Sequence, residues 1–170
     1  MKHHSGIREV HSNEIGMVRH DLYRGAIGKL NAAIANAYFI EAIAISESFI
    51  CDRLESRVSF LSGDDELARR HSTLGALVRR LNSSEKKADY ESLREVYDEI
   101  NVWRAARNKA IHNIVKLTVG QEQQTWETRY NALKSDALEG KRLFQKLASE
   151  IEKLKRKENR KKTAKIVKKS

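Results

Sequence analysis

The stretch DYESLREVYDEINVWRAARNKAIHNIVKL, residues 89–117, decides the fold of this chain of 170 residues. Its apolar side chains return every three or four positions, which is the spacing of one face of an α-helix. They are Leu93, Val96, Ile100, Trp103, Ala110, Ile114 and Leu117. The same spacing runs through the rest of the chain, which contains no proline. We therefore predict an all-α protein, an up-and-down bundle of four or five helices without a sheet.

Small polar residues and glycines set the expected helix boundaries. One long helical region is predicted over about residues 14–61, with a break near Gly25 or Gly28 and a stop at Ser62-Gly63-Asp64. The other helices are predicted over about residues 65–81, 89–117, and from about residue 121 into the C-terminal tail. No linker divides the chain, so we expect one domain over residues 1–152, with its core at about residues 30–150.

The net charge of +10 is concentrated at one end. Residues 153–170 contain ten Lys or Arg and a single acid, Glu158, which is a net +9, whereas residues 1–152 carry +1. Because so few of these residues are apolar, we expect the far end of this tail to be disordered. Two interpretations stay open, a solvated end or an RNA-binding arm that acts through counterion release. The arm would use Lys155, Arg156, Lys157, Arg160, Lys161 and Lys162.

Cysteine content and hydropathy indicate a cytoplasmic protein. The one cysteine, Cys51, cannot form an intramolecular disulfide and lies in an apolar run, where a thiol behaves as a small hydrophobe. The first thirty residues are polar and do not resemble a secretory leader. The most apolar stretch, Ala32 to Cys51, contains Glu41 and Glu47, so we interpret it as a core helix, with no membrane contact.

Several enzyme classes lack their motifs in this sequence. There is no glycine-rich phosphate loop, no paired-cysteine pattern, no His-Glu-x-x-His and no nucleophile elbow. His3, His4 and His11 lie in a polar N-terminal stretch without a spaced carboxylate or cysteine partner. We therefore predict neither a metal nor a cofactor.

A polar cluster interrupts the helix of residues 89–117 near its end, in WRAARNKAIHNIV, residues 103–115. Arg107 and His112 are five residues apart, roughly 140° around the helix axis and about 7.5 Å along it. Asn108 lies one turn before His112 on nearly the same face. One helix does not bring the arginine and the histidine together, but a two-fold pair of helices would place two of each around one cleft.

The six residues Arg107-Asn108-Lys109-Ala110-Ile111-His112 resemble the motif of the HEPN domains, R-x(4–6)-H, which very often opens with Arg-Asn. Requiring the asparagine lowers the number of matches expected by composition to roughly 0.03. The fold-level resemblance covers about residues 30–150. It implies a HEPN-like helical fold and metal-independent ribonuclease activity at a dimer cleft, leaving a 2′,3′-cyclic phosphate.

The side chains themselves suit this chemistry. RNA carries its own nucleophile, the 2′-hydroxyl, so cleavage needs a base, an acid and positive charge for the phosphorane. His112 can act as base or acid, Arg107 can bind phosphate oxygens, and Asn108 can orient either partner. The competing interpretation is a histidine at a helix terminus beside an arginine that only satisfies local carbonyls.

Glu47 stands out because it falls at helical spacing on a seam formed with Ile40, Ile43, Ile50 and Leu54. A buried carboxylate needs a partner, and Arg107 and Arg104 are the candidates. Some relatives in the family carry an acidic residue facing the motif, so Glu47 is a candidate supporting residue. The alternative is a glutamate at the edge of the core that reaches water. We interpret Trp103 and Trp126 as core or interface aromatics.

One departure from the family pattern and several alternative interpretations affect the expected biological role. In some toxin members a tyrosine two places after the histidine is adenylylated by an antitoxin, but here that position is Ile114. Any antitoxin would be a separate protein, because the chain contains no second catalytic module. The expected role is the toxin of a toxin–antitoxin or defence system. The alternatives are a non-catalytic nucleotide- or RNA-binding or scaffold module, and an RNA-binding protein that acts through its tail.

Overall fold

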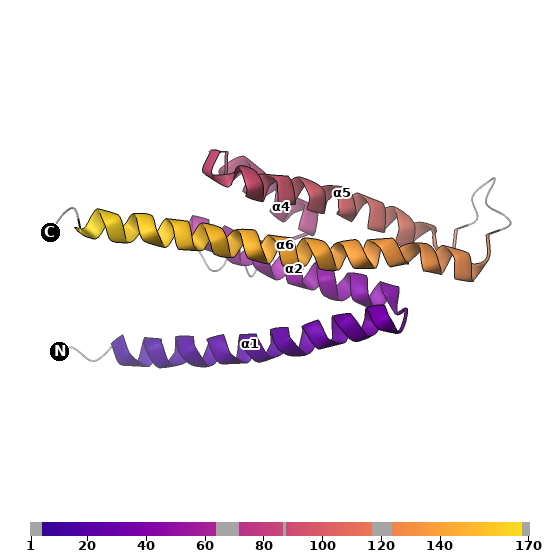
Figure 1. Ribbon diagram of the computed structural model, residues 1–170, viewed down its shortest axis with the longest axis horizontal. Coiled ribbons are helices and arrows are strands. Elements are labelled where there is room, and N and C mark those ends of the chain that lie inside the picture. Colours follow the sequence, from indigo (N-terminus) through magenta and orange to yellow (C-terminus); the bar gives the residue numbers. More distant parts are fainter. Residues whose placement is uncertain (1–4, 64–71, 87, 117–123, 168–170) are drawn as a thin grey trace.

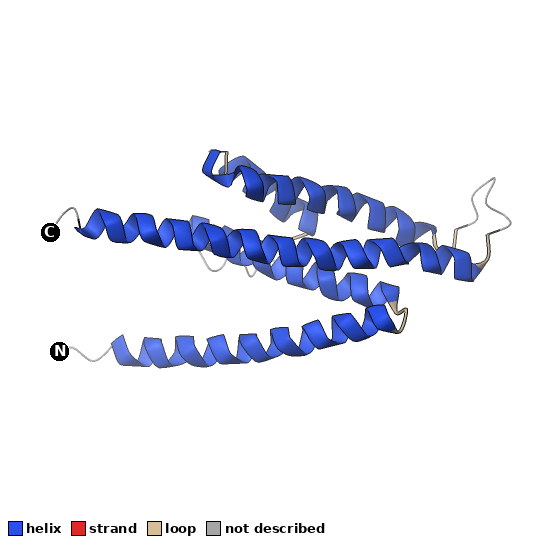
Figure 2. Ribbon diagram, in the orientation of Figure 1, coloured by secondary structure: helices blue, strands red, loops and turns tan. Residues whose placement is uncertain are grey.

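The structure, a computed structural model, describes residues 5–63, 72–86, 88–116 and 124–167, and within these ranges it describes side chains over residues 17–160 except residue 19. All regular structure in these ranges is helical (Figure 2), so the predicted all-α class is confirmed. The helices are α1 (Ser5–Ala35), α2 (Phe39–Ser62), α4 (Leu74–Ser84), the short 3-10 helix η1 (Ala88–Tyr90), α5 (Glu91–Asn113) and α6 (Trp126–Val167).

The long helix α6 organises the bundle (Figure 1). α2 and α5 pack along it, α4 contacts both α2 and α5, and α1 packs mainly on α2. α1 diverges from α6 toward the first residues of α1, and the start of α1 and the end of α6 lie at the same end of the molecule (Figure 1). The apolar faces of these helices form one core, whose fully buried members include Leu30, Ile50, Ile100, Leu133 and Leu147.

The break between the first two helices is not at a glycine. Gly25 and Gly28 lie inside α1, and the chain turns at residues 36–38, where Ala37 has a φ of 60°. The Asn36 side chain bonds back to the carbonyl of Ala32, and the Tyr38 amide bonds to the carbonyl of Ala33. The prediction of a break at Gly25 or Gly28 is therefore wrong, because an exposed glycine weakens a helix by only about 1 kcal/mol and α1 tolerates two.

Other helix ends follow the sequence signals more closely. Gly63 ends α2 in the left-handed conformation, with φ 68°, as predicted for Ser62-Gly63-Asp64. The predicted helix over about residues 65–81 is not continuous, because residues 72 and 73 are not helical and α4 extends to Ser84. Thr73 caps α4, accepting a hydrogen bond from the Ala76 amide through its side chain. α5 begins at Glu91 and ends at Asn113, inside the predicted range 89–117, and residues 64–71 and 117–123 lie outside the described residues.

The basic segment does not leave the bundle as a coil at residue 153, because α6 continues as helix to Val167. The basic segment is therefore helical over residues 153–167, and residues 168–170 lie outside the described residues. Leu154 is buried, and Lys157 bonds to Asp89 at 2.7 Å. Glu158 makes two hydrogen bonds with Arg57, at 2.9 and 3.2 Å. Composition alone does not reveal these anchors, which hold the first turns of the segment on the bundle.

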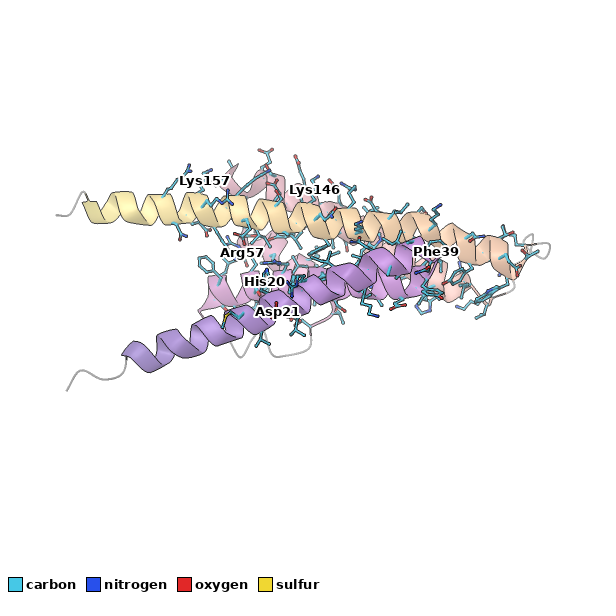
Figure 3. All side chains as sticks on the ribbon, turned by 60° about the horizontal axis from the view of Figure 1, so that its bottom comes forward. His20, Asp21, Phe39, Arg57, Lys146 and Lys157 are labelled. Atoms are coloured by element: carbon cyan, nitrogen blue, oxygen red, sulfur yellow. The ribbon has the colours of Figure 1, made fainter. Side chains whose placement is uncertain are left out.

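Arg57 is the centre of a buried polar network for which no prediction was made from the sequence. The Arg57 side chain is buried. In Figure 3 it lies below α6, the helix that carries the labelled Lys157. Besides Glu158, it contacts Glu85 at 2.6 Å, and Glu85 accepts the hydroxyl of Tyr97 at 2.7 Å. Burial disfavours the charge of Arg57, but the bonds from Glu158 and Glu85 outweigh burial and hold its pKa above the ordinary value. The network therefore joins α2, α5 and α6 to the end of α4.

None of the described helices combines the length and the apolar composition that a membrane crossing requires.

Candidate functional site

The candidate site is built on Trp103 of α5, which is buried where α5 packs on α6. Its indole N–H donates to the carbonyl of Asp136 at 2.8 Å. A Cβ placed on Gly140 would lie 2.6 Å from the tryptophan ring and 3.1 Å from Cβ of Ser46, so this position of α6 accepts only glycine. The predicted interpretation of Trp103 as a core aromatic is confirmed. This packing fixes the position of the next turn of α5, which carries Arg107.

Arg107 forms an ion pair with Glu47 of α2 through Nη2 and Oε1. The predicted pairing of Glu47 is therefore confirmed, with Arg107 as partner, while Arg104 bonds to Asn101 and packs on Gly75. The guanidinium also lies over the Trp103 ring, 5.6 Å from its centroid. The exposed fractions of the two side chains are 14% for Arg107 and 28% for Glu47, so the pair lies at the edge of the core. The expected seam is only partly buried, because Ile40 is exposed.

Most donors of Arg107 are unused within the part of the chain that the structure describes. Glu47 is its one hydrogen-bond partner there, and its buried Nε has none. A buried donor without an acceptor is uncommon in folded proteins. Arg107 is thus held in place by one carboxylate and keeps capacity for an anion at the exposed edge of the guanidinium.

His112 and Asn108 lie on a different face of α5 from Arg107. His112 is exposed and Asn108 half-buried, and neither side chain bonds to any other residue in the described ranges. A single protomer therefore does not bring Arg107 and His112 into one compact site, as the helix geometry predicts. The arrangement does place an exposed imidazole little more than a turn beyond an anchored arginine.

The motif lies at the end of the bundle where α2 begins, α5 ends and α6 begins, which we call the motif end. The Phe39 amide donates to the Tyr130 hydroxyl at 3.1 Å there. α4 begins near Arg104 and continues away from this end, so no described helix follows the last turns of α5 on that side. The large apolar side chains exposed at the motif end include Ile40, Val115 and Trp126. Trp126 is 52% exposed and stacks on Tyr130, so it is not a core residue.

A hollow of about 320 Å³ opens beside the motif, between the end of α5 and the start of α6. We call it the α5–α6 hollow. Its apolar walls come from Ala106, Ala110, Ile114 and Ala132, and its polar groups from Lys109, Asn113, Gln124 and Arg129. This hollow cannot be predicted from the sequence, because periodicity does not show which residues of two helices face each other at their ends.

The described residues contain no group of three or more His, Cys, Asp or Glu side chains that could hold a metal ion. His3 and His4 lie outside the described residues, and the side chain of His11 does too. Cys51 is a free, half-buried thiol on α2. Burial, and after it the charge of Glu47, raises the pKa of this thiol to about 11, so it is protonated and unreactive at neutral pH.

The tail residues predicted to bind RNA are only partly described. Lys155, Arg156, Lys157 and Arg160 are exposed on α6, while the side chains of Lys161 and Lys162 lie outside the described ones. Lys157 is paired with Asp89 and Lys155 with Glu152. Among these four, Arg156 and Arg160 have no hydrogen bond or ion pair to another described residue.

Comparison of the chain with protein-family models, with curated proteins and with solved structures gave no significant match.

Proposed function

We propose that the protein is a metal-independent endoribonuclease of the HEPN type that acts as a homodimer. The observation that carries the proposal is the anchored arginine with an exposed histidine beyond it. Glu47 and Trp103 hold Arg107 at the edge of the core, and its remaining donors have no partner among the described residues. His112 follows on the same helix with its imidazole exposed.

The proposed reaction uses the 2′-hydroxyl of RNA as nucleophile. One His112 accepts the proton of the 2′-hydroxyl as its oxygen attacks the adjacent phosphorus. A second His112 donates a proton to the 5′-oxygen as the bond between that oxygen and phosphorus breaks. The products are a 2′,3′-cyclic phosphate and a free 5′-hydroxyl. Arg107 stabilises the charge that develops on the phosphorane oxygens, and Asn108 orients the phosphate or the imidazole.

Two protomers are required because one helix separates the imidazole from the guanidinium. A second copy of α5 supplies the second histidine and brings each arginine near a histidine. The exposed apolar side chains at the motif end, Ile40, Val115 and Trp126, support pairing at that end.

We further propose that the enzyme is the toxin of a toxin–antitoxin or defence system. This role rests on the resemblance of residues 107–112 to the HEPN motif. Since Ile114 stands where some toxins carry a modified tyrosine, control by adenylylation of this position is not part of the proposal. An antitoxin, as a separate protein, would act by binding.

One observation favours a second candidate, a non-catalytic RNA-binding or scaffold module. Arg107 is already paired with Glu47 and only 14% exposed, which is also how a structural arginine is held. In that case RNA binding would follow the basic end of α6 and would not depend on His112.

The deciding experiment is cleavage of single-stranded RNA by the purified full chain in excess chelator. The wild type should cleave, and a substrate with 2′-deoxyribose at the cut position should resist. His112→Ala and Arg107→Ala should each lower the rate by at least about 10²-fold, because each removes a proton transfer or charge stabilisation. Matched controls are His20→Ala and Arg94→Ala, which remove exposed side chains away from the motif.

Light scattering at micromolar concentration should give about twice the protomer mass for the wild type and for both motif variants. Circular dichroism should show that the variants keep their helices. A strict monomer, a requirement for magnesium, or full cleavage by a folded His112→Ala dimer would each contradict the proposal. RNA binding without cleavage, unaffected by His112→Ala, would establish the binding module instead.

A further inference from the structure

The α5–α6 hollow lies immediately beside the motif. Lys109, which lines it, precedes His112 by three residues. Residues at this spacing are neighbours on a helix surface, with Cβ atoms about 5–6 Å apart. The lining residue Asn113 follows His112 directly. A molecule in the hollow therefore contacts residues that neighbour His112 on α5, although His112 itself does not line the hollow.

Arg129 connects the two helices that form the hollow and adds a positive charge to it. Its Nη1 donates to the carbonyl of Asn113 at 3.2 Å and to that of Lys116 at 2.5 Å. The carbonyl end of a helix carries partial negative charge and repels anions. Because Arg129 binds these carbonyls, it offsets that charge at the end of α5 and ties α5 to the start of α6.

The other polar side chains of the hollow have unused hydrogen-bonding capacity. Lys109, Asn113 and Gln124 form no side-chain hydrogen bond or ion pair with any residue that the structure describes. An amide offers both donors and an acceptor, which is what the edge of a nucleobase requires. An ammonium group offers charge to a phosphate. The walls of alanine and isoleucine side chains offer an apolar contact for the ring itself.

We infer that the α5–α6 hollow is a nucleotide subsite. The base lies against the walls, with its edge toward the amides of Asn113 and Gln124, and the phosphate lies at Lys109. The volume, about 320 Å³, is at the lower end of the range of about 300–1,000 Å³ for small-molecule sites. The inference deepens the proposed function, on which the choice of a ribonucleotide rests. In this proposal the residues that line the hollow determine which base is preferred next to the phosphate that is cleaved.

Binding tests the subsite without any cleavage. The full chain carrying His112→Ala is titrated with uridine and adenosine 3′-monophosphates and with the parent nucleosides, and amide shifts are followed by NMR. We expect saturable shifts at Ala110, Asn113 and Ala132 with at least one nucleotide. Adding Lys109→Ala should weaken nucleotide binding by at least about threefold, the effect of one exposed charge contact, and leave nucleoside binding unchanged.

A matched pair of variants on α6 separates the hollow from its surroundings. Ala132→Trp fills the hollow and should abolish binding, whereas Asn131→Trp, at an exposed neighbouring position that does not line it, should not. Equal binding by the two variants would overturn the inference, as would shifts with inorganic phosphate that nucleosides and nucleotides do not exceed. Abolished binding in Ala132→Trp supports the subsite even if the wild type does not cleave RNA. Wild-type cleavage with unchanged base preference in Ala132→Trp would support the nuclease and overturn the subsite.

Discussion

Arg107 depends on two different contacts for its position. Glu47 supplies a charge-assisted hydrogen bond, and the Trp103 ring supplies an apolar and cationic contact on the face of the guanidinium. Since both side chains of the ion pair are partly desolvated, the pair is worth more than one at the surface. Such a support keeps the arginine in one conformation, which is what the proposed stabilisation of a phosphorane by Arg107 requires.

A double-mutant cycle measures this support. Glu47→Gln, Arg107→Gln and the double variant are unfolded with urea, and we expect a coupling free energy of about 1–2 kcal/mol, the size found for contacting residues. The physical reason is that each single variant leaves the other partner half-buried without its counter-charge. Glu41→Gln, at an exposed position of the same helix, is the control and should not couple to Arg107→Gln. Effects that add to within about 0.5 kcal/mol would show that the ion pair contributes no fixed geometry.

The pairing of Glu47 could be predicted because it needs only a carboxylate on an apolar seam and a basic residue in the motif. The Arg57 network could not be predicted in the same way. Its members, Arg57, Glu85, Tyr97 and Glu158, come from four separate stretches of the chain, and three of them are among the most buried polar or large side chains described. Arg57 continues the seam of Ile50 and Leu54 at helical spacing, as Glu47 does, but the local sequence does not show which distant acids pair with it.

The helices show the same division between local and non-local causes. Gly63 acts through its own backbone, and its role as a helix end is predicted from sequence. Thr73 also acts through its own side chain, but the predicted helix over residues 65–81 passes through it. The turn at Ala37 is closed by nearby groups, the Asn36 side chain and the Tyr38 amide, although alanine itself favours helix. The first turns of the basic segment after residue 153 instead depend on partners far along the chain, Arg57 and Asp89, although a run of lysines favours disorder. The all-α class was predictable because it rests on periodicity alone.

The end of α6 should depend on Glu158, the single acid among residues 153–170. Glu158→Gln removes the charge from two hydrogen bonds to Arg57 and should lower the free energy of unfolding by about 1–3 kcal/mol. Hydrogen exchange should become faster at the amides of residues 155–160. Glu152→Gln, which alters an exposed pair with Lys155, is the control and should change stability by less than about 0.5 kcal/mol. Unchanged exchange in Glu158→Gln would mean that other contacts hold this segment.

Two positively charged regions, the motif and the basic segment of α6, lie at opposite ends of the bundle. The motif and its hollow lie where α5 ends and α6 begins, while the basic segment lies at the opposite end of α6 (Figure 1). Arg57 and Asp89 fix the first turns of that segment on the bundle, so its exposed residues Arg156 and Arg160 occupy a defined position. If RNA binds both regions, it extends along the molecule, and the two regions should contribute separately to affinity and to catalysis.

Truncation after Arg160 tests this separation. A cut after Glu152 would also remove Leu154 and Glu158, which pack and bond within the bundle, whereas residues 161–170 carry five lysines and no acid. We expect the truncated protein to stay folded and to bind RNA more weakly. The dependence of log affinity on log salt should flatten by about 0.7 for each phosphate of single-stranded RNA that the tail no longer neutralises, because fewer counterions are released. Fluorescence anisotropy at several salt concentrations measures this slope. Replacing the five lysines with glutamine should reproduce the effect at full length, and cleavage at saturating RNA should survive in both proteins. If truncation abolished cleavage at saturation while Arg107→Ala did not, the tail would be the functional part of the chain, and the Arg107 and His112 motif would have no role in catalysis.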